Sequence, residues 1–427
     1  METLRYGDRG LFVRYLQTAL KRAGYDPGSV DGVFGTRTLN ALTAFQRDNG
    51  LASDGIVGKM TWTHLYPYLA GYTMHVVRRG DTFQSIARMH STTAGAIETA
   101  NPDVTATNLP IGKRLVVPLA FDVVPTDVPY SYALNTILLD GLSARYPFIK
   151  TERIGSSVMG KQLEAAIIGT GGIEVFYNAS HHANEWITST LVMKYLENYS
   201  KAIVSGGRIA DVDANSIFEK TRLYLLPLVN PDGVDLVTGA LPPSDSYYTR
   251  AVAMSEFYPS IPFPSGWKAN IDGVDLNLGY PAGWEQARKI KFAQGYTRPG
   301  PRDFVGTAPL SQPENRAVYD FTLAHDFMLT LSYHTQGGVI FYKYLNYDPP
   351  RATEIALAFS RVSGYDVQET PYESGFAGYK DWFIQTYDRP GYTIEAGRGV
   401  SPLPLSQFPE IYRDNEGILT LGMAILT

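Results

Sequence analysis

Apolar runs alternate with amphipathic stretches from residue 130 to the end of this chain, and this alternation limits its fold more than any other feature. Four runs favour β-strands, at 173–178, 223–229, 327–333 and 391–394. Amphipathic helices are predicted between them, for example at 186–199 and 313–324. Continuous apolar strands need cover on both faces, so we expect an α/β domain with a mixed, mainly parallel sheet covered by helices.

A proline-spaced segment separates this domain from the start of the chain. Pro118, Pro125 and Pro129 are typical of a semi-rigid connector. The chain has 427 residues, too many for one ordinary core. We therefore place the α/β domain at 122–427 and expect two small domains before it, at 1–68 and 72–118.

The first of these segments contains one short motif twice. The sequence DGVFGTRT at 31–38 returns as DGIVGKMT at 54–61. Each copy predicts a tight Asp-Gly turn, an apolar anchor, a second glycine and a helix capped by threonine. If only the turns are considered, a generic helix–turn element explains them. The whole pattern, including TWTHL at 61–65, resembles the small three-helix peptidoglycan-binding domain, so we expect an all-α domain here.

The second segment carries three further motifs. They are VVRRGDTFQSIA at 76–87, IETANP at 97–102 and LPIGKRLVVP at 109–118. Their periodicity predicts strand, helix, helix and strand. The segment closely resembles a LysM domain, a family that reads glycans containing N-acetylglucosamine. A small βααβ domain with another partner is the alternative.

Charge and composition exclude several classes of function. The net charge of −5 and the pI near 5.8 leave no basic surplus for nucleic acid. No apolar run is long enough to insert into a membrane. The first residues lack the basic and apolar regions of a signal peptide, so the export route stays open. Cysteine is absent, and any metal must therefore be held by carboxylates and the seven histidines.

Three predicted strands are each followed by a residue that could take part in chemistry. His182 and Glu185 follow the first strand and are spaced so that a helical start can aim both at one point. His334 and Glu395 end two other strands. Taken alone, a histidine or glutamate in such a motif is more often a structural or solvent-exposed residue than a metal ligand or a catalytic base. Together, two imidazoles and a carboxylate form a catalytic zinc set with one position free for water, and Glu395 would be the general base.

The segment WKANIDGVDLNLGY at 267–280 adds polar side chains. Asp275 could hold the non-metal nitrogen of a ligand histidine. Lys268 could stabilise an oxyanion, although most lysines are solvated surface charges. Open α/β sheets build their sites at the carboxyl ends of strands, so we expect these segments to meet there.

In this order the motifs resemble the zinc carboxypeptidase family. The resemblance spans nearly all of residues 130–427 and includes LVNPDG at 228–233 and DW at 381–382. It implies a peptidase with one Zn²⁺ ion. The site residues that it implies are the zinc ligands His182, Glu185 and His334, the base Glu395, and Asp275, which would orient His182.

The chain departs from the family pattern at three positions. Leu278 follows Asn277 where the family has an arginine that grips the substrate's C-terminal carboxylate. Lys268 stands in place of an oxyanion-stabilising arginine, and Asn184 replaces an arginine between the first two ligands. Loss of the bidentate clamp favours an endopeptidase. The predicted substrate-binding residues are Asn277, Arg398 and Asn184, with Lys380 as a further candidate cation.

The combination resembles bacterial γ-D-glutamyl-L-diamino acid endopeptidases. The resemblance implies hydrolysis of peptidoglycan stem peptides between D-Glu and meso-diaminopimelate or Lys, with glycan strands and stem peptides as partners. It implies a place at the cell wall or spore, outside the cytoplasm. Two alternatives are a wall-anchored metallocarboxypeptidase, which Leu278 argues against, and a non-catalytic wall-binding protein, which the complete set of His182, Glu185, His334 and Glu395 argues against.

Overall fold

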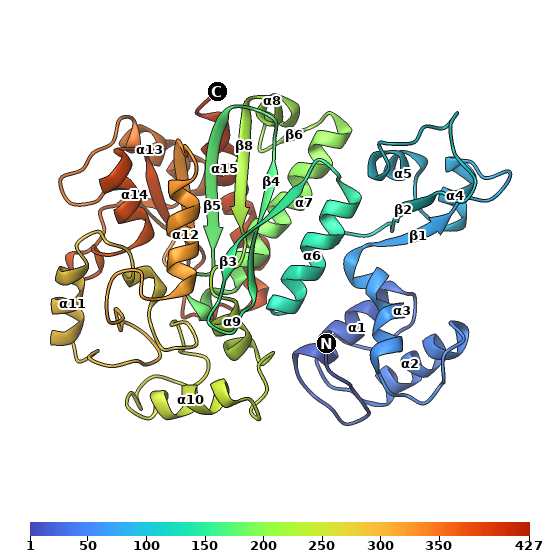
Figure 1. Cartoon of the computed structure of the whole chain (residues 1–427), viewed down its shortest axis with the longest axis horizontal. Coiled ribbons are helices and arrows are strands. Elements are labelled where there is room, and N and C mark those ends of the chain that lie inside the picture. Colours follow the sequence, from blue (N-terminus) through green and yellow to red (C-terminus); the bar gives the residue numbers. More distant parts are fainter. The chain divides into compact units, whose positions relative to one another are not determined.

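The computed structural model describes residues 1–427, which form two compact units. The first comprises Met1–Val128 and Ala133–Lys150, and the second comprises Pro129–Tyr132 and Thr151–Thr427. Figure 1 shows the chain coloured along its sequence. The segment 133–150 thus groups with the N-terminal residues, whereas the sequence analysis assigned it to the peptidase. The three predicted domain boundaries remain a prediction.

The first unit begins with three helices, as the first motif pair predicted. They are α1 (Leu11–Arg22), α2 (Thr36–Asp48) and α3 (Lys59–Ala70). A buried glutamine ties each Asp-Gly turn to the helix before it. Gln17 Nε2 donates to Asp31 Oδ1 at 2.9 Å, and its Oε1 accepts the Gly32 N–H at 2.9 Å. Gln46 repeats both contacts with the second turn, each at 3.0 Å, which explains why the motif recurs.

The predicted threonine caps of these helices are wrong. Gly35 and Gly58 occupy the N-cap positions of α2 and α3 and offer no side-chain oxygen. The threonines at 38 and 61 are buried instead. Their hydroxyls accept from the Nε2 groups of Gln17 and Gln46, at 3.2 and 3.4 Å. The threonines therefore complete the glutamine contacts and do not begin the helices.

The second motif set folds into the predicted βααβ arrangement. Its elements are β1 (Tyr72–Val76), α4 (Phe83–Met89), α5 (Ala94–Ala100) and β2 (Arg114–Pro118). The two strands pair antiparallel, with Tyr72 opposite Pro118. Thr82 begins α4 with a reciprocal capping box to Ser85. Apolar side chains from α4, α5 and β2, together with Val77 just after β1, form a small separate core.

Helix α6 (Tyr132–Arg145) joins the first unit through polar contacts. Asp140 Oδ2 accepts from the hydroxyls of Tyr66 and Tyr72, at 2.5 and 2.9 Å. Arg145 Nη1 donates to the carbonyl oxygens of Gly71, Leu119 and Phe121. The helix therefore contacts the three-helix segment, the βααβ segment and the connector.

The second unit is built on one mixed sheet in the order β11-β10-β12-β9-β5-β8-β4-β3. Strands β12, β9, β5 and β8 run parallel in its centre, and antiparallel pairs flank them at β10–β12 and β4–β8. This confirms the predicted fold class. The strands are β3 (Lys150–Ser156), β4 (Gln162–Ile168), β5 (Ile173–Ala179), β8 (Thr221–Leu226), β9 (Leu329–His334), β10 (Val339–Phe341), β11 (Asp366–Gln368) and β12 (Gly391–Glu395).

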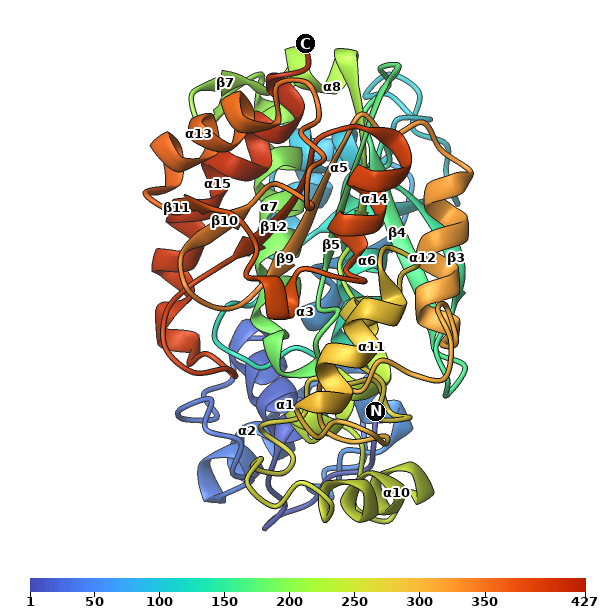
Figure 2. The same ribbon diagram turned by 90° about the vertical axis from the view of Figure 1, so that its left-hand side faces the viewer.

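Helices cover both faces of this sheet (Figure 2). Phe176 on β5 packs its ring against Phe321 on one face, with centroids 5.6 Å apart. The next residue, Tyr177, points to the other face and donates to the Leu419 carbonyl at 3.0 Å. The covering helices are α7 (Ile187–Ser205), α13 (Ala352–Ser363) and α15 (Phe408–Ala424) on one face, and α12 (Pro313–Leu323) and α14 (Tyr379–Tyr387) on the other.

The remaining elements are short and lie in the connections. They are β6 (Arg208–Ile209), β7 (Val212–Asp213), α8 (Ala214–Lys220), α9 (Pro231–Thr238), α10 (Ser246–Ser255), α11 (Trp284–Ala293), η1 (Ala183–Glu185), η2 (Leu276–Leu278), η3 (Tyr372–Ser374) and η4 (Leu405–Gln407). Strand β8 ends before Pro227, short of its predicted limit, because proline has no N–H to donate to a neighbour. No helix has both the length and the apolar character needed to cross a membrane.

Candidate metal centre and active site

Three parallel strands end at the same edge of the sheet and deliver the predicted residues there. His182 lies just beyond β5 and caps η1, whose last residue is Glu185. His334 ends β9 and stands directly opposite Glu395 at the end of β12. Ser180 turns the chain between β5 and η1 with a left-handed φ of 55°. The carboxyl edge of the sheet thus holds the site, as expected for an open α/β sheet.

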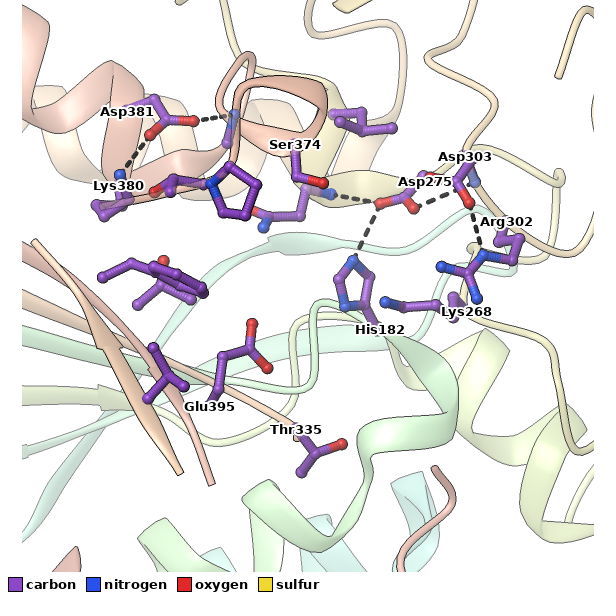
Figure 3. A pocket seen from close by; sticks show the side chains of 18 of the residues that line it. His182, Lys268, Asp275, Arg302, Asp303, Thr335, Ser374, Lys380, Asp381 and Glu395 are labelled. Atoms are coloured by element: carbon purple, nitrogen blue, oxygen red, sulfur yellow. Dashed lines mark hydrogen bonds and ion pairs between the residues drawn. The ribbon is translucent and has the colours of Figure 1, made fainter. Parts of the chain in front are cut away.

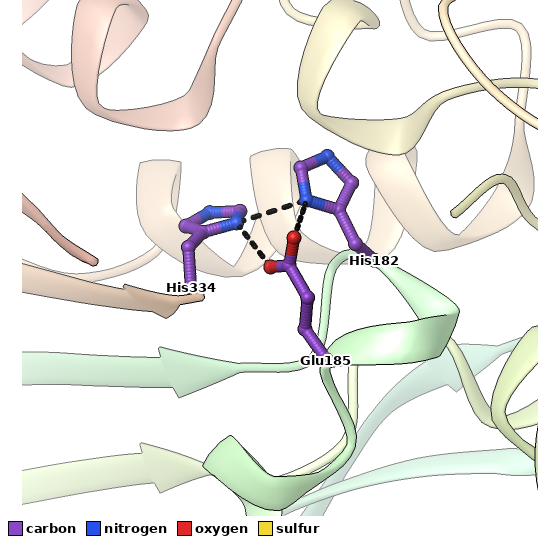
Figure 4. A group of neighbouring side chains, drawn as sticks. All are labelled: His182, Glu185 and His334. Carbon is purple, nitrogen blue, oxygen red and sulfur yellow. Dashed lines mark hydrogen bonds and ion pairs between the residues drawn. The ribbon is translucent and has the colours of Figure 1, made fainter. Parts of the chain in front are cut away.

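His182, Glu185 and His334 form one buried cluster (Figure 4). Their ligand atoms lie within 4.8 Å of one another. The Nδ1 atoms of the two histidines are 3.1 Å apart, and each is 3.0 Å from a different oxygen of Glu185. Two imidazole nitrogens and a carboxylate that converge in this way match the donor set of a catalytic zinc site.

Asp275 holds the other nitrogen of His182. His182 Nε2 donates to Asp275 Oδ1 at 3.1 Å, which leaves Nδ1 as the atom that faces the cluster. Burial would raise the pKa of Asp275, but His182 and Lys268 hold it well below its usual value. Burial would lower the pKa of His182, and the charge of Glu185 instead raises it to about 9. The carboxylate of Asp275 is therefore charged, as a residue that orients a metal ligand requires.

Glu395 and Lys268 face the same cluster from two sides. Lys268 Nζ is 3.3 Å from Glu185 Oε1, and its side chain is 20% exposed. The backbone carbonyl of Lys268 accepts the Ala183 N–H at 2.9 Å, which links its segment to η1. Burial and the charge of Glu185 raise the pKa of Glu395 to about 8, although Lys268 opposes them. Glu395 is thus a carboxyl group whose affinity for protons suits a general base near neutral pH.

A cavity of about 370 Å³ opens over the cluster (Figure 3). His182, Lys268, Asp275 and Glu395 line it at the sheet edge. Its other walls come from η2, from the segment 335–341 that includes β10, from η3 and the start of α14, and from α11 and the irregular segment after it. The cavity has both charged and apolar walls.

The predicted substrate-binding residues lie in different surroundings. Asn277 lines the cavity, and its Oδ1 accepts the Tyr379 N–H at 3.1 Å. Leu278 lines it too and is only 7% exposed. Asn184 is buried with no hydrogen-bond partner for Oδ1, and it is not part of the cavity wall. Arg398 is exposed outside the wall, with Nη1 donating to the Gly337 carbonyl at 3.2 Å.

Lys380 lines the cavity, but its charge is matched. Its Nζ is 2.5 Å from Asp381 Oδ1 and 2.5 Å from the carbonyl oxygen of Lys343. The side chain is 4% exposed. Lys380 therefore ties the start of α14 to the segment after β10 and has little charge left for a ligand.

Three charged residues of the cavity wall were not predicted from the sequence. Arg302, Asp303 and Lys291 belong to α11 and the irregular segment that follows it. That segment has no periodicity from which burial could be predicted. The adjacent Arg302-Asp303 pair, among glycine, proline and apolar residues, is the only local signal.

His181 stays outside the metal cluster, as the spacing predicted. Its Nε2 meets the Tyr280 hydroxyl at 3.0 Å, and its ring stacks near His334 with centroids 5.8 Å apart. Burial holds its pKa well below the usual histidine value. His181 is therefore a neutral structural residue beside the site.

A mixed α/β sheet that presents a buried His-Glu-His cluster and an opposed carboxyl group at its carboxyl edge defines a metallopeptidase. Residues 136–416 match the family described as "Zinc carboxypeptidase", and the chain belongs to that family. Zinc is the cofactor, and His182, Glu185 and His334 are the group able to hold it. Residues 9–65 match the peptidoglycan binding domain family and residues 75–118 the LysM domain family, which makes peptidoglycan the partner of this enzyme.

Two relatives and one solved structure are similar to this chain. The chain is 40% identical over 294 residues to gamma-D-glutamyl-L-diamino acid endopeptidase 1 of Lysinibacillus sphaericus, which covers 69% of this chain and 72% of the relative. It is 36% identical over 276 residues to the uncharacterized protein YqgT of Bacillus subtilis, covering 64% and 72%. The crystal structure of carboxypeptidase A from Helicoverpa armigera shares the fold, with a TM-score of 0.53, 17% identity, and coverage of 88% and 85%.

Proposed function

We propose that this chain is a wall-tethered endopeptidase that hydrolyses the γ-D-glutamyl–L-diamino acid bond of peptidoglycan stem peptides. The observation that carries the proposal is Leu278 in the cavity wall beside the metal cluster. A free C-terminal carboxylate placed against Leu278 would lose its hydration without gaining a charged partner. The similarity to the endopeptidase of Lysinibacillus sphaericus supports the same bond.

The proposed roles follow from the contacts around the cluster. His182, Glu185 and His334 would hold one Zn²⁺ ion, which when bound supplies an activated water and a Lewis acid. Glu395 would accept the proton of that water and deliver it to the leaving amine. Lys268 would donate to the oxyanion, and Asp275 would keep His182 in the correct tautomer.

The structure supports the predicted substrate-binding residues to different degrees. Asn277 supports the proposed role best, because Nδ2 makes no hydrogen bond within the chain and the residue lines the cavity. Asn184 is buried outside the cavity wall, so contact with a substrate would require its unpaired Oδ1 to become exposed. Arg398 would need a substrate that extends past the cavity, since it is exposed outside it. Lys380 would contribute only if Asp381 released it.

The N-terminal domains would keep the enzyme on its substrate. Binding to glycan strands raises the local concentration of stem peptides around the active site. This proposal places the protein at the cell wall or spore, outside the cytoplasm.

The test compares two soluble substrates with the zinc-loaded protein. One is the stem peptide L-Ala-γ-D-Glu-diaminopimelate-D-Ala, in which the diaminopimelate α-carboxyl is part of a peptide bond, and the other is a blocked dipeptide with a free C-terminal Phe or Arg. We expect faster cleavage of the first, with the γ-glutamyl bond identified by mass. Faster cleavage of the dipeptide would favour the metallocarboxypeptidase alternative, and cleavage of neither would contradict the proposed activity.

A further inference from the structure

Four lysine and arginine side chains line the cavity, and only three close carboxylates are paired with them. Lys380 is 2.5 Å from Asp381, Lys291 is 2.8 Å from Asp303, and Lys268 is 3.3 Å from Glu185. The fourth cation is Arg302. Its only carboxylate contact is with Asp303, which Lys291 already occupies. The Lys291–Asp303–Arg302 group therefore carries one net positive charge, next to the cavity.

The exposed hydrogen-bond donors of this group are on Arg302. Its Nε donates to Asp303 Oδ2 at 2.5 Å, whereas its two terminal amino groups make no hydrogen bond within the chain. The side chain is 41% exposed, compared with 9% for Lys291. A guanidinium group held at Nε presents its terminal nitrogens as a planar fork, which is the geometry that binds a carboxylate.

The backbone fixes Arg302 beside the reacting groups. The Pro301 carbonyl accepts the N–H groups of Lys268 and Ala269, at 2.7 and 2.9 Å. The Asp303 N–H donates to Asp275 Oδ2 at 3.3 Å. Figure 3 shows Arg302 next to Lys268 on one side of the cavity, with Lys380 on the opposite side. Arg302 is thus attached to the segment that carries the proposed oxyanion donor.

We propose that Arg302 binds the free α-carboxylate of the γ-linked D-glutamate, on the acyl side of the bond that is cut. The proposal rests on the proposed function. A γ-linked glutamate carries a free carboxylate a few bonds from the scissile carbonyl, whereas an α-linked residue has a peptide group there. Because Lys268 would hold the carbonyl oxygen, Arg302 beside it lies on the side where this carboxylate must be. Arg302 therefore selects γ-glutamyl over ordinary α-peptide bonds.

The substrate itself provides the cleanest test. Two stem peptides are compared that differ only at the glutamate α-position, one with the carboxylate (D-isoglutamate) and one with the neutral amide (D-isoglutamine). We expect the full-length zinc enzyme to prefer the acid in kcat/KM by roughly 10- to 100-fold, the range of a charge-assisted bidentate contact. Most of the difference should be in KM, since the carboxylate is bound in the ground state as well as in the transition state.

Variants of Arg302 test whether this residue binds the carboxylate. Arg302→Met should bring the two substrates close to equal, and Arg302→Lys should keep part of the preference. The matched control is Arg298→Ala, an exposed arginine of the same segment that stacks on Phe257 and is not part of the cavity wall. Asp303 keeps Lys291 as its partner when Arg302 is removed, so the variants should fold and retain zinc, which thermal melting and metal content check.

The outcomes separate this inference from the proposed function. Cleavage of neither stem peptide by the wild-type enzyme would refute both. Equal cleavage of both would refute the role of Arg302 while leaving the endopeptidase activity intact. A preference for the acid that survives in Arg302→Met would assign the carboxylate to another residue. If amidation of the diaminopimelate, and not of the glutamate, abolished the effect of Arg302, the bound carboxylate would be on the amine side and the inference would be wrong.

Discussion

His182 Nε2 and Asp275 Oδ1 lie 3.1 Å apart, and this contact determines which nitrogen of His182 faces the metal cluster. The same carboxylate accepts the N–H of Asn277 at 3.1 Å and that of Asp303 at 3.3 Å. Asp275 is therefore held by two backbone groups while it orients the imidazole. A metal site depends on such support as much as on its ligands.

Replacing Asp275 should weaken zinc binding. In Asp275→Asn the charge that stabilises the His182 tautomer is lost, and we expect zinc affinity to fall roughly 10- to 100-fold. Competition with a chromophoric chelator measures this. Asp272→Asn is the control, because Asp272 lies on the same loop and pairs with the exposed Arg250 at 2.9 Å. Equal zinc affinities for the two variants would show that Asp275 does not support the ligand.

Replacing Glu395 should separate metal binding from turnover. Glu395→Gln keeps the shape of the side chain but cannot accept a proton, so kcat should fall by roughly 10²- to 10⁴-fold or more. Zinc content should not change, because Glu395 is outside the ligand group. Glu354→Gln, at an exposed position paired with Arg351, serves as the control. Near wild-type turnover in a zinc-replete Glu395→Gln protein would remove Glu395 from the mechanism.

Glu314 should make the stability of the second unit depend on pH. It is fully buried, and it accepts from the Val158 N–H and from Asn270 Nδ2, at 3.1 and 3.3 Å. Burial raises its pKa to about 7 from the ordinary value of 4.5. The folded state thus binds the proton more tightly than the unfolded state. Its contribution to the free energy of unfolding should decrease by about 3 kcal/mol as the pH rises from 4.5 through 7.

Glu314→Gln should remove this part of the pH dependence, because the amide does not titrate. Urea unfolding of the two proteins between pH 4.5 and 7.5 measures the difference in slope. Glu256→Gln, an exposed residue at the end of α10, should leave the wild-type slope unchanged. The same slope in the wild-type protein and Glu314→Gln would show that Glu314 is ionised in the folded state throughout this range.

The N-terminal region should be more stable with helix α6 than without it. A fragment of residues 1–150 keeps the acceptor Asp140 for Tyr66 and Tyr72, and the donor Arg145 for three backbone carbonyls. A fragment of residues 1–128 loses these contacts and should melt several degrees lower. Both should bind insoluble peptidoglycan below their melting temperatures. Identical melting temperatures would mean that α6 contributes nothing to this unit.

Much of the molecule was predictable because its signals are local. The spacing of His182 and Glu185 belongs to one turn of chain, and the strand before them is a short apolar run. The repeated Asp-Gly turns are local as well. These features indicate the fold class and the candidate ligands independently of the rest of the chain, because turn chemistry and strand periodicity act over a few residues.

The cation next to the reacting groups was not predictable in this way. Arg398 was predicted to bind substrate because it is close to Glu395 in the sequence. The structure places it at the exposed surface outside the cavity. Arg302 lies in an irregular segment, and its position depends on the contacts of Pro301 with Lys268 and of Asp303 with Asp275. Hydrogen bonds between residues so far apart in the chain produce no periodic pattern in the sequence, so the position of Arg302 could not be predicted from it.

The sequence by itself thus determined the class of the sheet with its four central strands, the two small N-terminal folds and the identity of the three residues that form the cluster able to hold zinc. Only the tertiary structure decided which charges remain available to a substrate. Lys380 has its own counter-ion in Asp381 at 2.5 Å, whereas Lys291 and Arg302 share the single carboxylate of Asp303, at 2.8 and 2.5 Å. Whether a charge can act on a ligand depends on its neighbours in space, because a close counter-ion cancels most of its field.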